Sequence, residues 1–314
     1  MGRNANQAGW DRRRLLALRS MPGEAIREIL SETRRFAEAA PGSTYDDLAG
    51  RHVAMLFFED STRTRGSFTV AAQRLGAMVV DLSGKSTSVN KGETLIDTAA
   101  TVEAFGVAAM VVRSSAAGAA DLIGRHVKCA VINAGDGGHE HPTQGLLDAY
   151  TLCEALARLD GFDLKGVRIA IVGDVAHSRV ARSAIAVMRT LGAEVTIAGP
   201  AGMVSKGLGA ALGCAASHEF DAVIPEMDAV MMLRCQFERG AAIASAAEHR
   251  ALWQLDAARA AAMKDGAVVM HPGPANRGLE VASEVADGAR SVIRRQVQVG
   301  VFVRMAALRL CRGA

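Results

Sequence analysis

The segment STRTR, at residues 61–65, combines three hydroxyl side chains with two guanidinium groups. It follows an apolar run of strand type and precedes a helical pattern. The unpaired amides of a first helical turn would therefore lie beside it, and the helix dipole would favour an anion there. Ser61 is the expected N-cap residue, and the planar fork of Arg63 suits two phosphate oxygens. The segment predicts a phosphate site; the alternative is a capped helix with surface arginines.

This phosphate site would not be a P-loop, because the pattern G-x-x-x-x-G-K-[ST] is absent from the chain. Two more cations stand near predicted helix starts, where the helix dipole disfavours positive charge. They are Lys91, in STSVNKGETL at 86–95, and Arg179, in IAIVGDVAHSRVARS at 169–183. An anionic ligand would account for both, although an ordinary loop lysine is the alternative for Lys91. A nicotinamide-dependent dehydrogenase is the weaker alternative, since only Gly173 stands where a dinucleotide-binding turn needs three glycines.

The segment NAGDGGHEHPTQGLLD, at residues 133–148, places two histidines beside acidic residues. This arrangement invites a metal site at His139 and His141, but no distant Cys/His cluster completes a ligand shell, so we expect no metal. The favoured interpretation is that His141 donates to a carbonyl oxygen, with Gln144 on the first helical turn facing the same ligand. A loop histidine that caps the helix is the alternative.

Two later segments carry groups suited to carboxylates and amides. Arg234 and Gln236 follow an apolar run, and residues two apart share a face if the strand continues, which suits a carboxylate. In VVMHPGPANRGLE, at 268–280, Pro272 and Pro274 predict an extended backbone after a strand. Proline cannot donate, so carbonyls there could accept from a ligand amide; a rigid turn is the alternative.

The elements that must position these residues alternate between strand and helix patterns. The alternation starts at the apolar run 52–58 and restarts at 164–174, which predicts an α/β fold of two doubly wound domains. Each domain would be a parallel sheet covered by helices, with the active-site cleft between them. We expect domains at 1–150, joined by the C-terminal helix at about 290–314, and at 151–289. Since ligands bind beyond the carboxyl ends of parallel strands, the site loops would be 59–66, 113–118, 133–144, 173–179, 234–240 and 271–280.

Composition excludes several classes of protein. The net charge of +3 is too small for a nucleic-acid binder, and no apolar run approaches the roughly 20 residues of a membrane span. No export signal is visible. The five scattered cysteines suggest reduced thiols in a cytoplasmic protein. The segment LLALRSMPGEAIREIL, at 15–30, has the pattern of one amphipathic helix.

Through these residues, the chain resembles the carbamoyltransferase family over about residues 14–310. The motifs of that family occur here in its order and spacing: STRTR, then KGETL, then NAGDG with HPTQ, and last HPGP with NRG and Glu280. STRTR and HPTQ are shared with ornithine carbamoyltransferases, whose late motif resembles His-Cys-Leu-Pro. Here that motif begins His271-Pro272-Gly273, and together with Arg-x-Gln at 234–236 it is similar to the aspartate enzymes.

The resemblance implies transfer of the carbamoyl group of carbamoyl phosphate to the α-amine of L-aspartate, in pyrimidine biosynthesis, with no cofactor and no metal. It implies a phosphate site at Ser61, Thr62, Arg63 and Thr64. The carbamoyl carbonyl would be contacted by Thr64, Arg113 and His141, and its amide by Gln144 and the carbonyls of Pro272 and Gly273. Aspartate would be bound by Arg179, Arg234, Gln236 and Lys91. The catalytic set would be Arg63, Thr64, Arg113, His141 and Lys91.

The resemblance also implies a homotrimer with shared active sites, in which Lys91 and a nearby hydroxyl enter from a neighbouring subunit. Spacing assigns that hydroxyl to Thr87, with Ser88 as the alternative. Asp60 and Gly273 depart from the family pattern, Asp60 by replacing a frequent proline. The alternatives are an ornithine or other amino-acid carbamoyltransferase, or an inactive anion-binding subunit, and the sequence leaves open whether regulatory or dihydroorotase chains attach.

Overall fold

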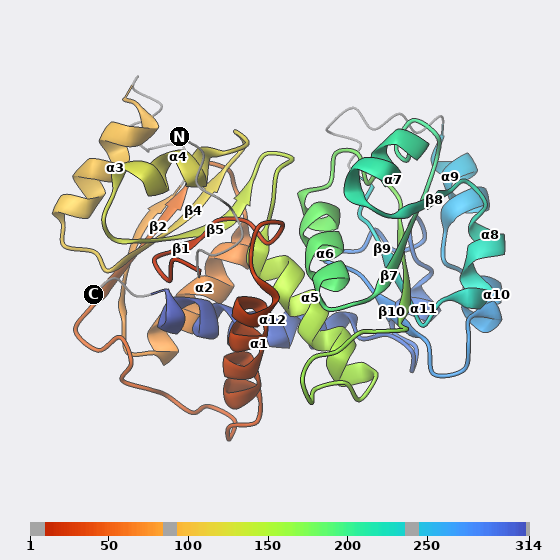
Figure 1. The fold of residues 1–314 in the computed structure, drawn as a ribbon, viewed down its shortest axis with the longest axis horizontal. Helices are drawn as coiled ribbons and strands as arrows, with labels where there is room; N and C mark the ends of the chain where they lie inside the picture. The colour runs from red at the N-terminus through yellow and green to blue at the C-terminus, as the bar shows by residue number, and fades with distance from the viewer. Residues whose placement is uncertain (1–9, 84–92, 236–244, 312–314) are drawn as a thin grey trace. The chain divides into compact units, whose positions relative to one another are not determined.

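Two separate parallel sheets form the framework of the chain (Figure 1). The structure, a computed structural model, describes residues 10–83, 93–235 and 245–311. It divides into unit 1, Met1–Thr143 with Gly300–Ala314, and unit 2, Gln144–Val299. The predicted fold class, parallel sheets covered by helices in two units, is confirmed. None of the helices that the structure describes combines the length and the apolar character that a bilayer crossing requires.

The unit 1 sheet has the strand order β1-β5-β4-β2-β3, and all its pairs are parallel. Its strands are β1 (Arg14–Leu15), β2 (His52–Phe57), β3 (Met78–Ser83), β4 (Ala109–Ser114) and β5 (Ala130–Asp136). Its helices are α1 (Gly23–Ala37), α2 (Thr62–Arg74), α3 (Leu95–Ala104) and α4 (Ala119–His126). Helices α5 (Pro142–Ala155) and α12 (Ile293–Leu310) each contribute residues to both units.

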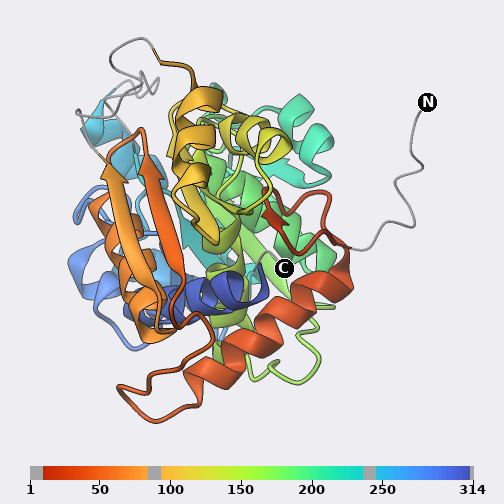
Figure 2. The ribbon, with the colours of Figure 1, turned by 90° about the vertical axis from the view of Figure 1, so that its left-hand side faces the viewer.

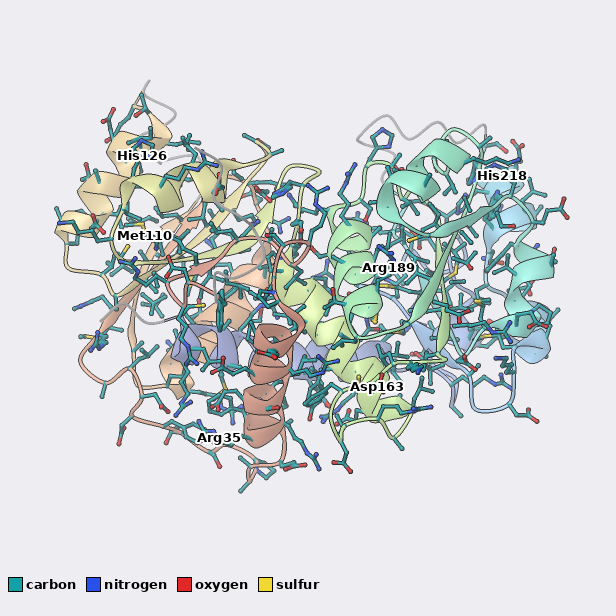
Figure 3. The ribbon with its side chains drawn as sticks, viewed as in Figure 1. Arg35, Met110, His126, Asp163, Arg189 and His218 are labelled. Atoms are coloured by element: carbon teal, nitrogen blue, oxygen red, sulfur yellow. The ribbon has the colours of Figure 1, made fainter. Side chains whose placement is uncertain are left out.

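Both faces of the unit 1 sheet are covered, which is why β2 and β4 are nearly continuous apolar runs. Helices α3 and α4 pack on one face, where Ala54, Leu56 and Met110 join a buried cluster. Helix α2 lies on the opposite face (Figures 1 and 2). Figure 3 shows Met110 inside unit 1, between the sheet and the helices, and Arg35 and His126 on its outside.

Unit 2 repeats the architecture with the strand order β10-β9-β6-β7-β8, again all parallel. The strands are β6 (Arg168–Val172), β7 (Glu194–Ala198), β8 (Ala215–Ser217), β9 (Ala229–Met232) and β10 (Val268–Met270). The helices are α6 (Arg179–Thr190), α7 (Lys206–Leu212), α8 (Phe220–Val223), α9 (Ala246–Trp253), α10 (Ala257–Ala262) and α11 (Ser283–Ala286), with the 3-10 turn η2 (Ile224–Glu226). Residues of α8 to α11 share one core with β6 and β9, built around Phe220, Trp253 and Met232.

The prediction of one helix over 15–30 is wrong at its beginning. Leu15 lies in β1, where it pairs with Ile132 of β5, and α1 begins only at Gly23. Pro22 is the N-cap residue, with an extended ψ of 142°. Proline is tolerated at a helix start but interrupts a helix interior, so the helix cannot continue back through this position.

In each unit, parallel pairing brings the carboxyl ends of the strands to one edge of the sheet. In unit 1 this edge carries the loops after β2, β4 and β5, and in unit 2 those after β6, β9 and β10. These are the loops in which the sequence placed the polar residues, and they are where ligands bind in open α/β sheets.

Candidate active site

The STRTR segment forms the start of α2 directly after β2. Ser61 is the N-cap residue, as predicted, although its hydroxyl does not cap any of the described amides of α2. Thr62 and Arg63 are exposed, whereas Thr64 is buried at 8% exposure. The first turn of α2 contains no acidic residue. Amides, hydroxyls and a cation therefore gather at a helix N-terminus, an arrangement that favours an anion.

Arg113 lies next to this turn, on the neighbouring strand of the sheet. In β4 it is paired with Phe57, and its carbonyl accepts the N–H of Phe58 at 2.9 Å. The buried guanidinium donates from one terminal nitrogen to the carbonyl of Ala134 at 3.0 Å, and its Nε lies 3.7 Å from a carboxylate oxygen of Glu59. Arg113 is therefore held between β5 and the loop that leads into α2.

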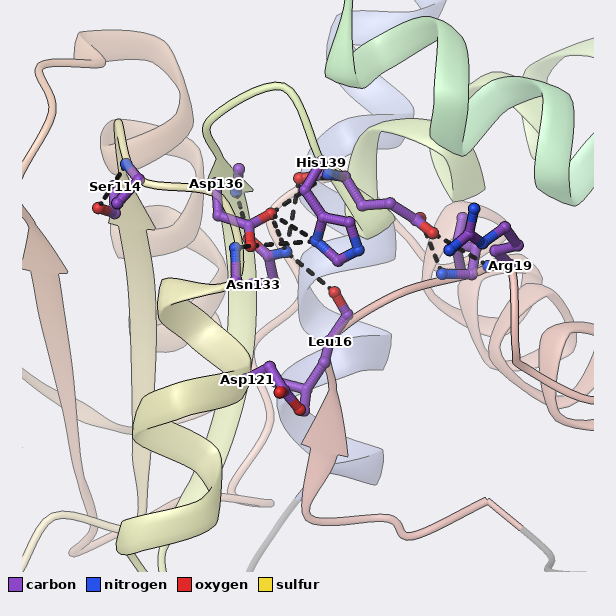
Figure 4. A network of polar contacts seen from close by, with 12 residues as sticks. Leu16, Arg19, Ser114, Asp121, Asn133, Asp136 and His139 are labelled. Atoms are coloured by element: carbon purple, nitrogen blue, oxygen red, sulfur yellow. Dashed lines mark hydrogen bonds and ion pairs between the residues drawn. The ribbon is translucent and has the colours of Figure 1, made fainter. Parts of the chain in front are cut away.

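His141 follows β5 and immediately precedes α5, and it is buried at 4% exposure. The loop before it closes on itself, because the N–H of Asp136 donates to the carbonyl of Glu140 at 3.2 Å. His139, considered above as a metal ligand, has its Nδ1 at 3.1 and 3.2 Å from the two carboxylate oxygens of Asp136 (Figure 4). The same edge of unit 1 thus carries the residues predicted to contact phosphate and carbonyl: Ser61, Thr62, Arg63, Thr64, Arg113 and His141.

Gln144 has a defined amide orientation within unit 2. Its Nε2 donates to Asp148 at 2.9 Å, so its Oε1 is the side that can accept from a ligand amide. Asp148 also accepts from Gln296 Nε2 at 2.8 Å, and Gln296 Oε1 accepts the N–H of His271 at 3.0 Å. One hydrogen-bonded chain thus joins Gln144 to the loop of Pro272 and Gly273. The sequence indicated neither Asp148 nor Gln296, although Asp148 stands four residues after Gln144 on the same helix.

The loop after β10 turns where the sequence predicted an extended backbone. Gly273 has a φ of +65°, in the left-handed region, and its N–H donates to His271 Nδ1 at 2.8 Å. Glycine adopts this conformation readily because it has no Cβ. The prediction of an extended backbone is therefore wrong at Gly273.

Two arginines predicted to bind aspartate lie after strands of unit 2, one at a helix start and one in a loop. Arg179 is the first residue of α6 and is buried at 6% exposure, and Arg234 follows β9. The next residue, Cys235, donates its N–H to Glu280 Oε1 at 2.7 Å, while Glu280 Oε2 accepts the N–H of Asn276 at 2.7 Å. Glu280 is fully buried. Its two hydrogen bonds therefore join the Arg234 loop to the loop after β10. Thr87, Ser88, Lys91 and Gln236 lie outside the described residues.

Burial shifts the pKa of each titratable group beside the Arg234 loop toward the uncharged form. Cys235 Sγ lies 3.0 Å from Nε2 of His249, and both side chains are buried. Burial raises the pKa of the Cys235 thiol to about 12 and lowers the pKa of His249. It also raises the pKa of Glu280, although hydrogen bonds from Cys235 and Asn276 oppose that shift.

The buried His249 should make unit 2 sensitive to acid. The imidazole resists protonation in the folded chain but takes up a proton in the unfolded chain below its ordinary pKa of about 6.5. The free energy of unfolding should therefore fall as pH drops from 7.5 to 5.5, and more steeply in the wild type than in His249→Gln. Urea unfolding followed by tryptophan fluorescence in a Trp10→Phe background, which leaves Trp253 on the same helix as the probe, measures both slopes. Equal slopes would show that His249 does not cause the dependence.

Comparison with known proteins relates both halves of the chain to one family. Residues 13–154 match the model "Aspartate/ornithine carbamoyltransferase, carbamoyl-P binding domain", and residues 165–311 match "Aspartate/ornithine carbamoyltransferase, Asp/Orn binding domain". The chain is 50% identical to the aspartate carbamoyltransferase catalytic subunit of Myxococcus xanthus over 95% of this chain and 99% of that one. It is also 50% identical to that of Acidothermus cellulolyticus, over 92% and 88%.

Solved structures give the same relationship at lower identity. Aspartate transcarbamoylase from Trypanosoma cruzi, in complex with carbamoyl phosphate and aspartate, has a TM-score of 0.81 at 31% identity, covering 94% of each chain. Ornithine carbamoyltransferase from Pyrococcus furiosus has a TM-score of 0.84 at 28% identity, covering 96% of this chain and 97% of that one. The fold therefore does not separate the aspartate from the ornithine enzymes, whereas the sequence identities favour the former.

Proposed function

The chain belongs to the aspartate/ornithine carbamoyltransferase family, and we propose that it transfers the carbamoyl group of carbamoyl phosphate to the α-amine of L-aspartate. The products are N-carbamoyl-L-aspartate and phosphate, a step of pyrimidine biosynthesis. The assignment of aspartate as the substrate depends on the 50% sequence identity, over almost the whole chain, to aspartate carbamoyltransferase catalytic subunits. The late HPGP motif and the Arg-x-Gln at 234–236 support it. The first unit binds carbamoyl phosphate and the second binds aspartate.

The phosphate of carbamoyl phosphate binds at the start of α2. Ser61, Thr62 and Thr64 supply hydroxyl donors, and Arg63 supplies a fork for two oxygens. The amides of the first turn and the helix dipole add to this anion site. The exposure of Thr62 and Arg63 supports the role, because both side chains are accessible to a ligand.

The carbamoyl group lies between donors and acceptors of fixed orientation. Arg113, His141 and Thr64 contact its carbonyl oxygen. Gln144 Oε1 and the carbonyls of Pro272 and Gly273 accept from its amide, which distinguishes the amide end from the oxygen. The hydrogen bond from Gln144 Nε2 to Asp148 supports this polarity.

Catalysis consists of positioning and charge stabilisation. The amine nitrogen of aspartate forms a bond to the carbamoyl carbon, and the carbonyl becomes a tetrahedral oxyanion. Its C–O bond to phosphate then breaks, and the leaving phosphate takes the proton of the amine, so no protein base is required. Preorganised donors aimed at the developing oxyanion lower the barrier, and holding two anions side by side removes much of the entropic cost.

Aspartate is bound through its two carboxylates. Arg179 and Arg234 pair with them, and Gln236 and Lys91 complete the set. The buried tie between Glu280 and Cys235 supports this role for Arg234, because it fixes the backbone from which that side chain projects. Ornithine would bring a second amine to this cationic surface and would be repelled.

A product assay tests the substrate assignment directly. The protein should form N-carbamoyl-aspartate from carbamoyl phosphate and aspartate and should form no citrulline when ornithine replaces aspartate. Formation of citrulline alone would identify an ornithine enzyme. No product with either amino acid would favour an anion-binding subunit.

The active enzyme is a homotrimer with shared sites, in the cytoplasm. Its five described cysteines are free, which suits a reducing compartment. Lys91, with Thr87 or Ser88, enters the site of the neighbouring subunit. Regulatory or dihydroorotase chains could attach to such a trimer without changing this chemistry.

Subunit mixing should reveal the shared site. Lys91→Ala chains and Arg113→Ala chains should each be nearly inactive. Mixed trimers should recover part of the activity, because some sites then combine an intact Lys91 with an intact Arg113. Sizing and mass spectrometry confirm that subunits have exchanged. No recovery after confirmed exchange would place both residues in the site of a single chain.

A further inference from the structure

Asp136 is a buried carboxylate at the end of β5 that the catalytic assignment does not use. It is 1% exposed. Its Oδ2 accepts the N–H of Gly118 at 2.7 Å, and its Oδ1 accepts from Asn133 Nδ2 at 2.8 Å and from the N–H of Glu140 at 3.2 Å. Figure 4 shows these bonds converging on the one side chain.

These bonds join the two loops that flank the carbonyl-binding residues. Gly118 ends the loop that follows Arg113 on β4, and Glu140 is the residue immediately before His141. A further bond, from the N–H of Gly137 to the carbonyl of Ser114 at 2.9 Å, runs between the same loops. One carboxylate thus links the backbone on either side of the carbamoyl carbonyl site.

The two loops are in direct contact at Gly137. Its φ is +47°, and a Cβ built there would lie 2.6 Å from the backbone nitrogen of Ala117. A side chain at this position would therefore force the loops apart. The spacing between them is fixed by sterics as well as by hydrogen bonds.

The backbone before His141 has a second anchor. The carboxylate of Glu140, buried at 3% exposure, accepts the N–H groups of Leu18 at 2.8 Å and Arg19 at 3.1 Å. Asn133 Nδ2 donates to the carbonyl of Leu16 at 2.9 Å as well as to Asp136 (Figure 4). Glu140 is therefore held on both its backbone and its side chain, which leaves His141 little freedom to shift.

We propose that Asp136 is a positioning residue for carbamoyl transfer, holding Arg113 and His141 at the spacing that the carbonyl oxygen requires. The inference rests on the proposed function of those two residues. A carboxylate is needed because the groups from Gly118, Asn133 and Glu140 are all donors. An asparagine would turn its own NH₂ toward at least one of them, leaving a buried donor unsatisfied.

The test is Asp136→Asn, alone and combined with His141→Ala. Asp136→Asn should lower turnover by roughly ten- to hundredfold, since small misplacements of reacting groups have effects of that size. Inhibition by inorganic phosphate should stay within about twofold of wild type, because the phosphate is assigned to the start of α2 and not to Arg113 or His141. In the His141→Ala background most of the Asp136→Asn loss should disappear, since residues that act as a unit are not additive.

Two further variants sharpen the result. Gly137→Ala changes no charge but forces the loops apart, so it should reproduce the loss of turnover. Asp121→Asn, at a partly exposed position of α4, is the matched control and should leave turnover unchanged; Asp121 pairs only with Arg125 among its described ion pairs. Asp121 lies in the same unit as Asp136.

Several outcomes would overturn the proposal. One is unchanged turnover in Asp136→Asn. Another is a loss of turnover that is fully additive with that of His141→Ala. A third is phosphate inhibition that weakens in parallel with turnover. An Asp136→Asn chain that unfolds at the assay temperature would assign Asp136 to folding alone. A wild-type chain that forms no carbamoyl-aspartate would instead contradict the proposed function. His141→Ala without effect would contradict the role of His141.

Discussion

Arg113→Ala should lower turnover by about a hundredfold or more, the usual cost of removing one donor from an oxyanion site. Arg113 is only 9% exposed, and its guanidinium is oriented by Ala134 and Glu59. A donor fixed in a poorly solvated site stabilises developing charge without reorganisation, so most of its effect should appear in kcat. Steady-state assays at saturating carbamoyl phosphate and aspartate measure it.

Two variants control for this result. Arg113→Lys keeps the charge but loses the fork, so it should recover only part of the turnover. Arg125→Ala removes an exposed arginine from α4 that pairs with Asp121, and it should leave turnover unchanged. Near-wild-type turnover in a folded Arg113→Ala protein would remove Arg113 from the mechanism.

Arg63→Ala and Arg65→Ala should have opposite consequences although the two residues are neighbours in one motif. Arg63→Ala should abolish measurable binding of carbamoyl phosphate in calorimetry at concentrations that saturate the wild type. Arg65 is paired with Asp81 on β3 at 3.4 Å, and both side chains are more than one-third exposed. Arg65→Ala should therefore keep ligand binding and lower stability by at most about 1 kcal/mol, or disturb assembly.

The comparison uses thermal unfolding and sizing beside calorimetry. Each variant serves as the control for the other, because both remove one arginine from the same turn. If Arg65→Ala abolished binding while Arg63→Ala only lost stability, the roles of the two arginines would have to be exchanged.

The parallel strands were predictable because a strand that is buried on both faces needs apolar residues at nearly every position. Runs such as Arg168–Val172 and Ala229–Met232 are almost entirely apolar, and their shortness favours a buried strand over a helix. The two-residue β1 was not predictable, since it exists through pairing with Val131 and Ile132, far away in sequence. Its neighbourhood reads as an amphipathic helix until Pro22 is taken into account.

The candidate site also contains residues that the sequence predicted and residues that it did not. Residues placed on strand ends, such as Arg113 and Arg234, follow from the rule for parallel sheets. The buried carboxylates that join the loops of the site do not, because each also makes a contact across a long separation in sequence. Glu280 reaches Cys235, and Asp148 reaches Gln296. In the sequence, Asp136 was only one of the acidic residues beside His139 and His141, and its contact with Gly118 comes from the packing of two loops.

The closing part of α12 has a consequence for how the protein is made. Residues from Gly300 onward belong to unit 1, where Arg304 lies over the ring of Phe68 and Arg309 pairs with Asp47. A ribosome therefore delivers all of unit 2 before the last piece of unit 1. Domains usually become native in the order of their synthesis, but here the half that is begun first is completed last.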